Sequence, residues 1–395
     1  MSSVNAYPQA DPLAGVVLDG RYRVDTLIAT GGMSAVYRGL DLRLDRPVAL
    51  KIMDSRYAGD TQFLTRFQRE ARAVARLAHA GLVAVYDQGG GTVGGHPPFL
   101  VMELVEGGTL RELLRERGPM PPHAAAAVLG PVLSGLAVAH RAGLVHRDIK
   151  PENVLISTGG DVKIADFGLV RAVAEAKITS TSVILGTAAY LSPEQVSTGS
   201  ADPRSDVYAV GILTYELLTG TTPFTGDSAL AVAYRRMDHD VPPPGSVIAG
   251  VPAHFDDLVL RATARDPAGR YADATEMGDE LDEIVDELGL PPFRVPAPRL
   301  SAPSATAAPV PRPPSAAAPS PRRPTRTLNR DDWSPAEPEY PPPSQRFAGI
   351  DLDEFYWARQ RAKRALLFWT VAVLTLTGLI AAAAWTIGGN LGNLI

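Results

Sequence analysis

The stretch "HRDIKPENVLI", His146–Ile156, is the most specific signal in this chain, and "DFG", Asp166–Gly168, begins thirteen residues after Asn153. The first stretch contains all five fixed residues of the pattern H-R-D-x-K-x-x-N. An ordinary polar loop between two strands has no reason to keep a carboxylate, an ammonium and an amide at this spacing. The two motifs therefore predict a single polar site to which the surrounding segments contribute.

Residues 20–290 show the patterns of a globular domain. Alternation typical of strands occurs at 22–29, 34–41, 47–54, 81–89 and 98–105, and a helical pattern covers 60–77. From Leu110 onward helical patterns dominate, with short strands near 154–156 and 162–164. The sequence therefore predicts an α+β, bilobal fold with a small β-rich lobe, a larger helical lobe and a ligand cleft between them.

Composition excludes several classes of function. The chain has 395 residues and no cysteine, which excludes disulfides, thiolate metal sites and a cysteine nucleophile. Residues 1–290 carry 26 basic and 36 acidic side chains, a net charge of −10, so nucleic acid is not an expected partner. Residues 291–395 carry 12 basic and 7 acidic side chains, a net charge of +5. The basic tail predicts a different partner from that of the globular part.

The C-terminal part predicts a membrane anchor. Residues 365–387 form an uncharged stretch of 23 residues, long enough as a helix to cross a bilayer, with Trp369 and Trp385 near its ends. Basic side chains precede it and none follows, so the positive-inside rule places the globular domain in the cytoplasm of the cell. Residues 388–395 then form a short extracytoplasmic tail.

Two segments are expected to connect the globular domain to the membrane anchor. Residues 291–349 are rich in Pro, Ala and Ser, with 17 of the 35 prolines in 291–345, which predicts a disordered linker. It is either a bare spacer or a docking site for a proline-reading module. Residues 350–364 mix aromatic and basic side chains, so they form either an amphipathic helix on anionic lipids or a continuation of the membrane helix. Residues 1–19 are expected to be a flexible N-terminus.

Taken with "VALKI", Val48–Ile52, and "SPE", Ser192–Glu194, the motifs resemble those of a bacterial, eukaryotic-like serine/threonine protein kinase over residues 20–290. The resemblance implies ATP as the phosphate donor, Mg²⁺ (with Mn²⁺ as an alternative) and protein substrates. It also implies the two-lobed kinase fold. Lys150, with Pro151 and Glu152 after it, is similar to the serine/threonine class rather than the tyrosine class.

The resemblance assigns the catalytic roles residue by residue. Lys51 would hold the α- and β-phosphates, and Glu70 on the following helix would orient it. Asp148 would accept and orient the substrate hydroxyl, and Lys150 would reach the γ-phosphate. Asn153 and Asp166 are the expected metal ligands, because their hard oxygens suit Mg²⁺.

The stretch "IATGGMSAVYRG", Ile28–Gly39, is an ambiguous glycine-rich loop. Only Gly31 matches a glycine of the pattern G-x-G-x-x-G-x-V, so the stretch alone fits a plain hairpin equally well. With the other motifs in register it is expected to be the nucleotide loop. Its predicted contacts are Ile28, Ala29, Thr30, Gly31, Gly32, Met33, Ser34, Ala35 and Val36. Ala29 and Ser34 depart from the family's glycines and predict a stiffer loop.

The resemblance also predicts the adenine site. Val36 and Ala49 would lie above the ring and Leu155 below it. Met102 is similar to the gatekeeper residue. Residues Glu103 to Val105 are similar to the hinge, whose backbone meets the edge of the adenine ring.

Between Asp166 and "SPE" lies the predicted activation segment. Thr179 and Thr181 resemble paired threonines that are phosphorylated in the bacterial family, and a phosphate there would face Arg147. The alternative is that this Thr/Ser-rich loop is merely polar. Thr187 is expected to be structural. Further predicted contacts join Glu194 to Arg270 and Asp206 to the catalytic loop.

Two functions follow from these assignments. The first is an active, membrane-anchored kinase that autophosphorylates, for which a homodimer is an expected partner arrangement. The second is a catalytically dead scaffold that acts through its tail and membrane helix. Because Lys51, Glu70, Asp148, Asn153 and Asp166 are all present, the sequence favours the active enzyme.

Overall fold

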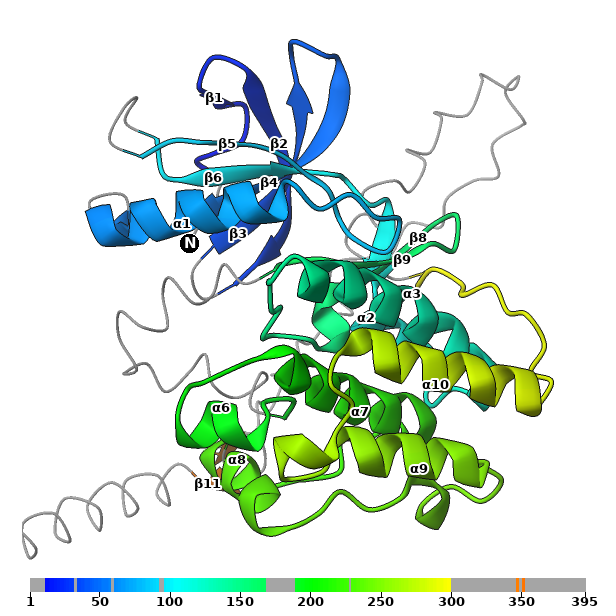
Figure 1. Ribbon diagram of the computed structural model, residues 1–395. Helices are drawn as coiled ribbons and strands as arrows, with labels where there is room; N and C mark the ends of the chain where they lie inside the picture. The colour runs from blue at the N-terminus through cyan, green and yellow to red at the C-terminus, as the bar shows by residue number, and fades with distance from the viewer. Residues whose placement is uncertain are drawn as a thin grey trace, which may run out of the picture. The chain divides into compact units, whose positions relative to one another are not determined.

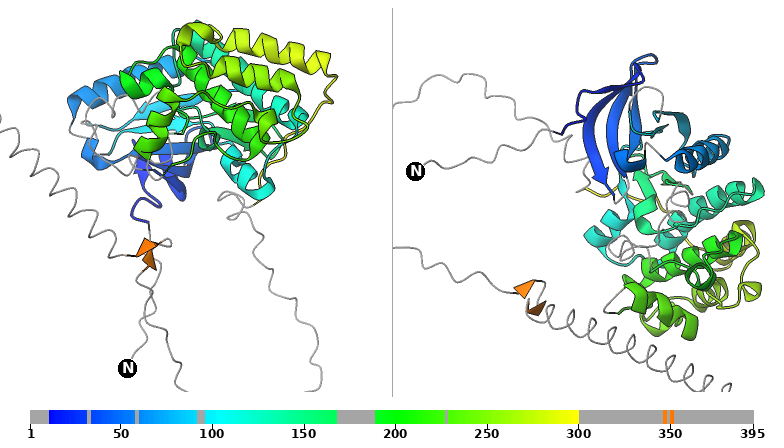
Figure 2. Two further views of the ribbon diagram at one scale, coloured as in Figure 1. Left: turned by 90° about the horizontal axis from the view of Figure 1, so that it is seen from below. Right: turned by 90° about the vertical axis from the view of Figure 1, so that its left-hand side faces the viewer.

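The computed structural model describes residues 11–31, 34–57, 60–91, 96–167, 189–226 and 229–299, together with 346–347 and 350–351. It divides the chain into two compact units, Met1–Arg312 and Pro313–Ile395. In the first unit a β-rich lobe lies beside a helical lobe (Figure 1), and the views in Figure 2 keep the same division. In the second unit, β10 (Arg346–Phe347) pairs antiparallel with β11 (Ile350–Asp351).

The β-rich lobe is one antiparallel sheet in the order β1-β2-β3-β4-β6-β5, covered by helix α1 (Thr61–Val74). Its strands are β1 (Val17–Leu18), β2 (Tyr22–Thr30), β3 (Ser34–Asp41), β4 (Arg46–Met53), β5 (Val85–Gly89) and β6 (Phe99–Met102). Helix α1 begins where the Asp60 side chain accepts hydrogen bonds from the backbone N–H groups of Gln62 and Phe63. The predicted strands and helix are confirmed, with boundaries shifted by a few residues.

Strand β4 supplies two separate cores because its side chains alternate between the faces of the sheet. Ala49 and Met53 join the cluster that packs under α1, which includes Phe63 and Phe67. Val48, Leu50 and Ile52 belong to the cluster on the other face. By the same alternation Lys51 lies on the α1 face, and its neighbours across the sheet are Val36 on β3 and Leu100 on β6.

The helical lobe is built around α7 (Pro203–Thr219), which is buried along almost its whole length. Its other helices are α2 (Leu110–Arg117), α3 (Pro122–Arg141), α6 (Pro193–Ser197), α8 (Ala229–Asp238), α9 (Ala253–Ala262) and α10 (Ala274–Glu287). Short 3-10 turns occur at η1 (Ser55–Tyr57), η2 (Pro151–Asn153), η3 (Pro244–Ser246) and η4 (Pro267–Gly269). A small sheet, β7 (Gly107–Thr109), β8 (Val154–Ser157) and β9 (Val162–Ile164), joins this lobe to the first.

The C-terminal strap, residues 290–299, packs against the helical lobe although most of it falls in the predicted linker. Val295 is only 3% exposed and belongs to the main core. Arg294 donates to the Gly159 carbonyl at 2.7 Å, and the Arg299 N–H donates to Glu116 at 2.7 Å. The folded domain therefore extends at least nine residues past its predicted end, and the rest of the predicted linker lies almost wholly outside the described residues.

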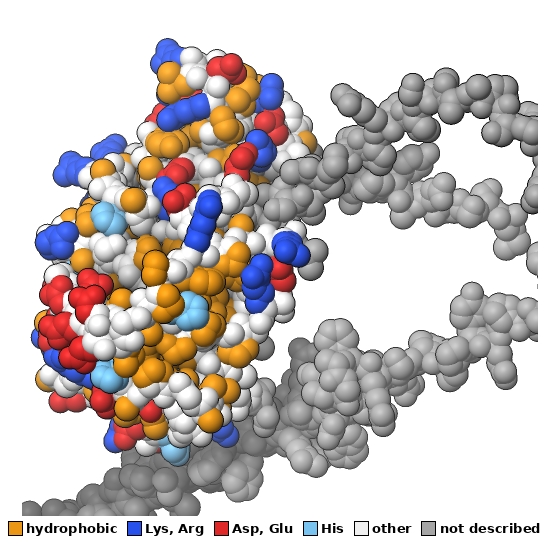
Figure 3. All heavy atoms as spheres, turned by 90° about the vertical axis from the view of Figure 1, so that its right-hand side faces the viewer, with side chains coloured by type: hydrophobic (Ala, Val, Ile, Leu, Met, Phe, Trp, Pro, Cys, Tyr) orange, Lys and Arg blue, Asp and Glu red, His pale blue; other side chains and the backbone are white. Residues whose placement is uncertain are grey.

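Figure 3 shows the right-hand side of the molecule as drawn in Figure 1. This face carries hydrophobic side chains over its middle and a group of acidic side chains at its edge. Phe293 of the strap is 40% exposed and stacks edge-on against His123 of α3, with ring centroids 5.2 Å apart. The strap thus contributes to the surface of the lobe as well as to its core.

The predicted membrane helix, 365–387, lies outside the described residues. Within the described part of the chain, α3 alone is long and apolar enough to cross a membrane, and 61% of that stretch is buried inside the protein. Such burial is ordinary for a core helix, so α3 is weak evidence for a membrane span.

Candidate active site

The predicted catalytic loop is held by one buried carboxylate, that of Asp206 on α7. Asp206 accepts hydrogen bonds from the backbone N–H groups of His146 and Arg147, both at 2.7 Å. It also accepts one from Nε2 of His140 at 2.9 Å, while Nδ1 of that ring accepts from the Ala274 N–H. Arg147 has a φ of 71°, a left-handed conformation that costs energy for a residue other than glycine. The predicted role of Asp206 in fixing this loop is confirmed.

Asp148 lies at the centre of a compact polar cluster. Lys150 Nζ is 2.8 and 3.0 Å from its two carboxylate oxygens. Asn153 Nδ2 donates to the Asp148 carbonyl at 2.7 Å and to its Oδ2 at 3.0 Å. Because Nδ2 is engaged in this way, Oδ1 is the Asn153 atom left to bind a cation. The structure thus brings together three of the predicted site residues.

Lys51 and Asp166 form the second half of the site. Lys51 Nζ is 2.7 Å from Asp166 Oδ1, and the lysine is 7% exposed. Burial favours protonation of Asp166, but the nearby Lys51 ammonium outweighs it and keeps the pKa of this carboxyl below its usual range. Glu70, on α1, remains the predicted partner that orients Lys51; among the described residues, Lys51 forms an ion pair with Asp166.

The two halves are connected through the backbone. The Ala165 N–H donates to the Asn153 carbonyl at 2.8 Å, and His146 Nε2 is 2.9 Å from the Ala165 carbonyl. Asp166 follows directly and has a φ of 65°. Its neighbour Phe167 stacks edge-on against the His146 ring, with centroids 4.6 Å apart. The cation, the carboxylates and the amide are therefore collected in one place.

The predicted adenine residues share one hydrophobic cluster. Ala49 and Met102 are buried in it, and Val36, Val105 and Leu155 pack against it. Glu103 behaves differently, because its backbone N–H donates to the Ala84 carbonyl and its carboxylate pairs with Lys163 at 2.7 Å. The apolar walls predicted for the nucleotide base thus lie together.

The glycine-rich stretch is a β-hairpin at this site. Ala29 and Thr30 on β2 pair with Val36 and Ala35 on β3, and the Gly31 N–H donates to the Ser34 carbonyl at 2.8 Å. Ile28, on the same strand, falls at the irregularity in register between Leu27 and Ala29 and is half-buried. Gly32 and Met33 lie outside the described residues.

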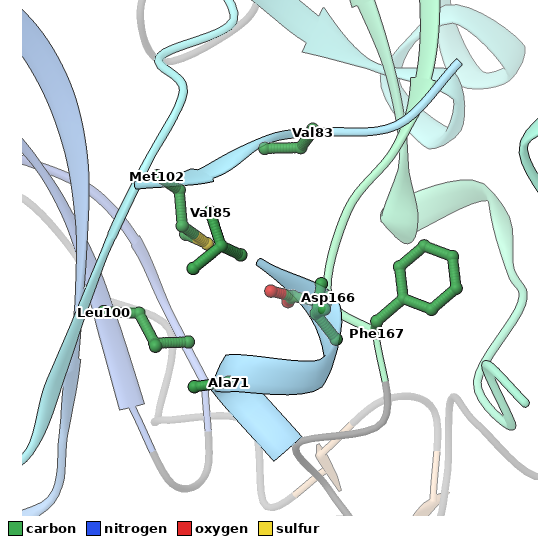
Figure 4. A pocket seen from close by; sticks show the side chains of 8 residues that line it. Ala71, Val83, Val85, Leu100, Met102, Asp166 and Phe167 are labelled. Atoms are coloured by element: carbon green, nitrogen blue, oxygen red, sulfur yellow. The ribbon is translucent and has the colours of Figure 1, made fainter. Parts of the chain in front are cut away.

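An apolar pocket opens behind Met102 and ends at Asp166 (Figure 4). It is lined by Ala71, Val74, Val83, Val85, Leu100, Met102, Asp166 and Phe167. Helix α1 forms one side of it and the sheet another. A shift of α1 would change both this pocket and the surroundings of Asp166.

The predicted activation segment is described only at its end. Thr179, Thr181 and Thr187 lie outside the described residues. Beyond them, Glu194 and Arg270 form the predicted pair, with two contacts of 2.9 Å, and Arg270 has no exposed side-chain surface. Ser205 also donates to Glu194 at 2.6 Å. Burial raises the pKa of Glu194, but its hydrogen bonds outweigh burial and lower the value to about 2.

Sequence reasoning missed one polar cluster beside Asp148. Arg111 contacts Glu152, Tyr190 and Glu216, which lie 41, 79 and 105 residues away in the chain. No local pattern links residues at such separations. Glu152 stood within a recognised motif, but nothing in the sequence pointed to its partner.

Comparison with known proteins fits this geometry. Residues 22–278 match the model of the protein kinase domain. The chain is 65% identical to the serine/threonine-protein kinase PknL of Mycobacterium tuberculosis, over 98% of both chains. It is 43% identical to the serine/threonine-protein kinase PknB of Mycobacterium leprae over 70% of this chain, which is 44% of that protein.

Solved structures give the same fold. A crystal structure of the PknI kinase domain of Mycobacterium tuberculosis matches with a TM-score of 0.54 and 27% identity. The match covers 68% of this chain and 97% of that one. The β-sheet lobe and helical lobe described above are thus the two lobes of a protein kinase fold. The chain belongs to the protein kinase family, as a serine/threonine-protein kinase.

Proposed function

We propose that this protein is a membrane-anchored kinase that transfers the γ-phosphate of ATP to serine and threonine hydroxyls of proteins, including its own Thr179 and Thr181. The observation that carries the proposal is the convergence of Lys51, Asp166, Asn153 and Asp148 on one polar site between the lobes. Phosphoryl transfer needs positioned charge more than covalent help from the protein, and this site supplies it.

The residues fit Mg²⁺ by their donor chemistry. Asp166 stays ionised, since its pKa is held below the usual range, and Asn153 keeps Oδ1 for a cation. Carboxylate and amide oxygens are the ligands that Mg²⁺ accepts in small number. When bound with ATP, the metal would neutralise charge on the phosphate oxygens.

The reaction assigned to the protein's own groups is an in-line displacement. Asp148 orients the substrate hydroxyl and takes its proton as the hydroxyl oxygen bonds to the γ-phosphorus. The bond from that phosphorus to the bridging oxygen breaks, and ADP leaves with the electron pair. Lys150, already beside Asp148, faces the transferred group with its positive charge. Lys51 would exchange part of its contact with Asp166 for the phosphates.

Anchoring and autophosphorylation rest on the sequence. Residues 365–387 supply the span, and residues 350–364 would meet anionic lipids or continue the helix. Two chains held in one membrane would phosphorylate each other as a homodimer, which places Thr179 and Thr181 in reach of a partner's site. Their phosphates would pair with Arg147, next to Asp148.

The test is mass spectrometry of the purified full chain after incubation with ATP and Mg²⁺. Phosphate on Thr179 and Thr181 is expected, and Thr179→Ala with Thr181→Ala should lower transfer to an added protein substrate about tenfold or more. Thr198, exposed beyond the segment, provides the control: Thr198→Ala should leave the rate unchanged. A doubly substituted chain as active as its parent would contradict the regulatory role.

A further inference from the structure

Arg111 on α2 connects three other parts of the helical lobe. Its Nε donates to Glu152 Oε1 at 2.8 Å, its Nη1 to Glu216 Oε1 at 2.5 Å and its Nη2 to the Tyr190 hydroxyl at 2.7 Å. The Tyr190 hydroxyl in turn donates to Glu216. One guanidinium thus holds the turn η2, the helix α7 and the C-terminal end of the predicted activation segment.

Three of the four side chains in this cluster are shielded from water, whereas the side chain of Glu152 is 43% exposed. The Arg111 side chain is 19% exposed, that of Glu216 is 6% exposed, and Tyr190 is 3% exposed. Burial and the nearby Glu216 carboxylate raise the pKa of Tyr190, so its hydroxyl stays protonated and can donate. A planar guanidinium that forks between fixed acceptors sets their relative positions, which a single ammonium cannot do.

The cluster reaches the reacting groups through one turn of chain. Glu152 is the middle residue of η2 and directly precedes Asn153. Asn153 holds Asp148 through its side-chain amide at 2.7 and 3.0 Å. A displacement of Glu152 would therefore move Asn153 through the peptide bond that joins them. Asn153 would in turn move Asp148 through its two hydrogen bonds.

We infer that Arg111 is a positioning residue that fixes the turn carrying Asn153 relative to Tyr190, and so aligns Asp148 with the C-terminal end of the activation segment. The inference rests on the proposed role of Asp148. In the described part of the chain, the hydrogen bonds of Arg111 go to Glu152, Tyr190 and Glu216, none of which is a predicted nucleotide- or metal-binding residue. Its loss should therefore affect the rate of transfer more than the binding of ATP.

The test uses the full chain in detergent micelles, with rates expressed per molecule able to bind nucleotide, so that unfolded protein is not counted. Arg111→Met should lower kcat for a protein substrate about tenfold to a hundredfold, because a misplacement of about 1 Å at reacting groups costs that much. The dissociation constant for ATP should stay within about twofold. Arg111→Lys should restore part of kcat, since it keeps a charge but not the fork.

Two further variants separate positioning from simple stability. Arg117→Met on the same helix removes an exposed arginine whose ion pair within the described residues is with the adjacent Glu116, and it should leave kcat unchanged. Glu152→Gln should lower kcat in the parent but cause no further loss in Arg111→Met, because both substitutions break one contact.

If the losses of kcat caused by Glu152→Gln and Arg111→Met multiply in the double variant, the inference is overturned. An Arg111→Met protein with an unchanged kcat per folded molecule and only a lower Tm would also overturn it. A parent chain without transfer activity, or one indifferent to substitution of Asp148, would instead refute the proposed function. The two failures are therefore distinguishable.

Discussion

At the scale of single residues, the site depends on buried charges that are matched by neighbours. Asp206 has no exposed surface, yet it accepts hydrogen bonds from two backbone N–H groups and a histidine. These contacts offset the cost of the left-handed backbone at Arg147 and hold Asp148 in place. A carboxylate outside the reaction thereby determines the shape of the loop inside it.

The Glu194–Arg270 pair predicts a specific pH dependence. The pKa of Glu194 is lowered from an ordinary 4.5 to about 2, so the pair stabilises the folded state above pH 4.5 and loses this effect as pH falls toward 2. Glu194→Gln should reduce the free energy of unfolding by about 3 kcal/mol at pH 7, because it leaves Arg270 buried beside a neutral group. Urea unfolding of both proteins at pH 7 and pH 3.5 measures the difference, which should shrink at the lower pH. An equal difference at both pH values would contradict the assignment.

The residue-scale features differ in how far the sequence could predict them. Asp206 and the Glu194–Arg270 pair were predicted, because the resemblance carries their roles at fixed places. The Arg111 cluster was not, since its members are distant in sequence and meet only after α2 and α7 have packed. Lys51 shows a further limit: the sequence analysis named Glu70 as its partner and Asp166 only as a metal ligand, so it did not predict the ion pair between Lys51 and Asp166.

At the scale of elements, hydrophobic periodicity predicted most of the secondary structure but missed the strap. Strands β2 and β3 follow the predicted alternation closely, because Tyr22, Val24 and Tyr37 belong to the core cluster on the face of the sheet away from α1. The strap has no helix or strand, and its prolines suggested a linker. Val295 and Pro298 are nevertheless buried, which shows that irregular chain can complete a core when side-chain hydrogen bonds fix its ends.

The strap makes a testable contribution to stability. Val295→Ala should lower the free energy of unfolding by about 2 kcal/mol, since it deletes two buried methyl groups from the main core. The matched control is Phe293→Ala, a larger truncation at a residue that is 40% exposed, which should cost less. Chemical unfolding of the full chain measures both. A negligible effect of Val295→Ala would show that the strap is not part of the folded domain.

At the scale of the whole molecule, we propose that a linker of low complexity joins the folded kinase domain to a membrane anchor. The kinase domain occupies the first unit, and the predicted anchor belongs to the second. The sequence predicted the division between a domain and a tail from composition alone. It placed the boundary too early, because proline content reports the lack of regular structure and not the lack of packing.

Deletion of residues 365–387 should separate anchoring from catalysis. The parent is expected in the membrane fraction after an alkaline carbonate wash, and the deleted form in the supernatant, since the remaining chain lacks another long, exposed apolar stretch in its described part. Phosphate transfer to an added substrate should persist in both forms. A deleted chain that still sediments with membranes would contradict the assignment of the span.

Asp148 is proposed to receive the proton of the attacking hydroxyl. Asp148→Asn keeps the size of the side chain and one acceptor oxygen but removes its charge and its basicity. Incorporation of labelled phosphate from ATP should fall by about a hundredfold or more in this variant, while nucleotide binding measured on the same preparation stays near that of the parent. Equal incorporation of phosphate by Asp148→Asn and the parent would contradict the assignment of Asp148 as the proton acceptor.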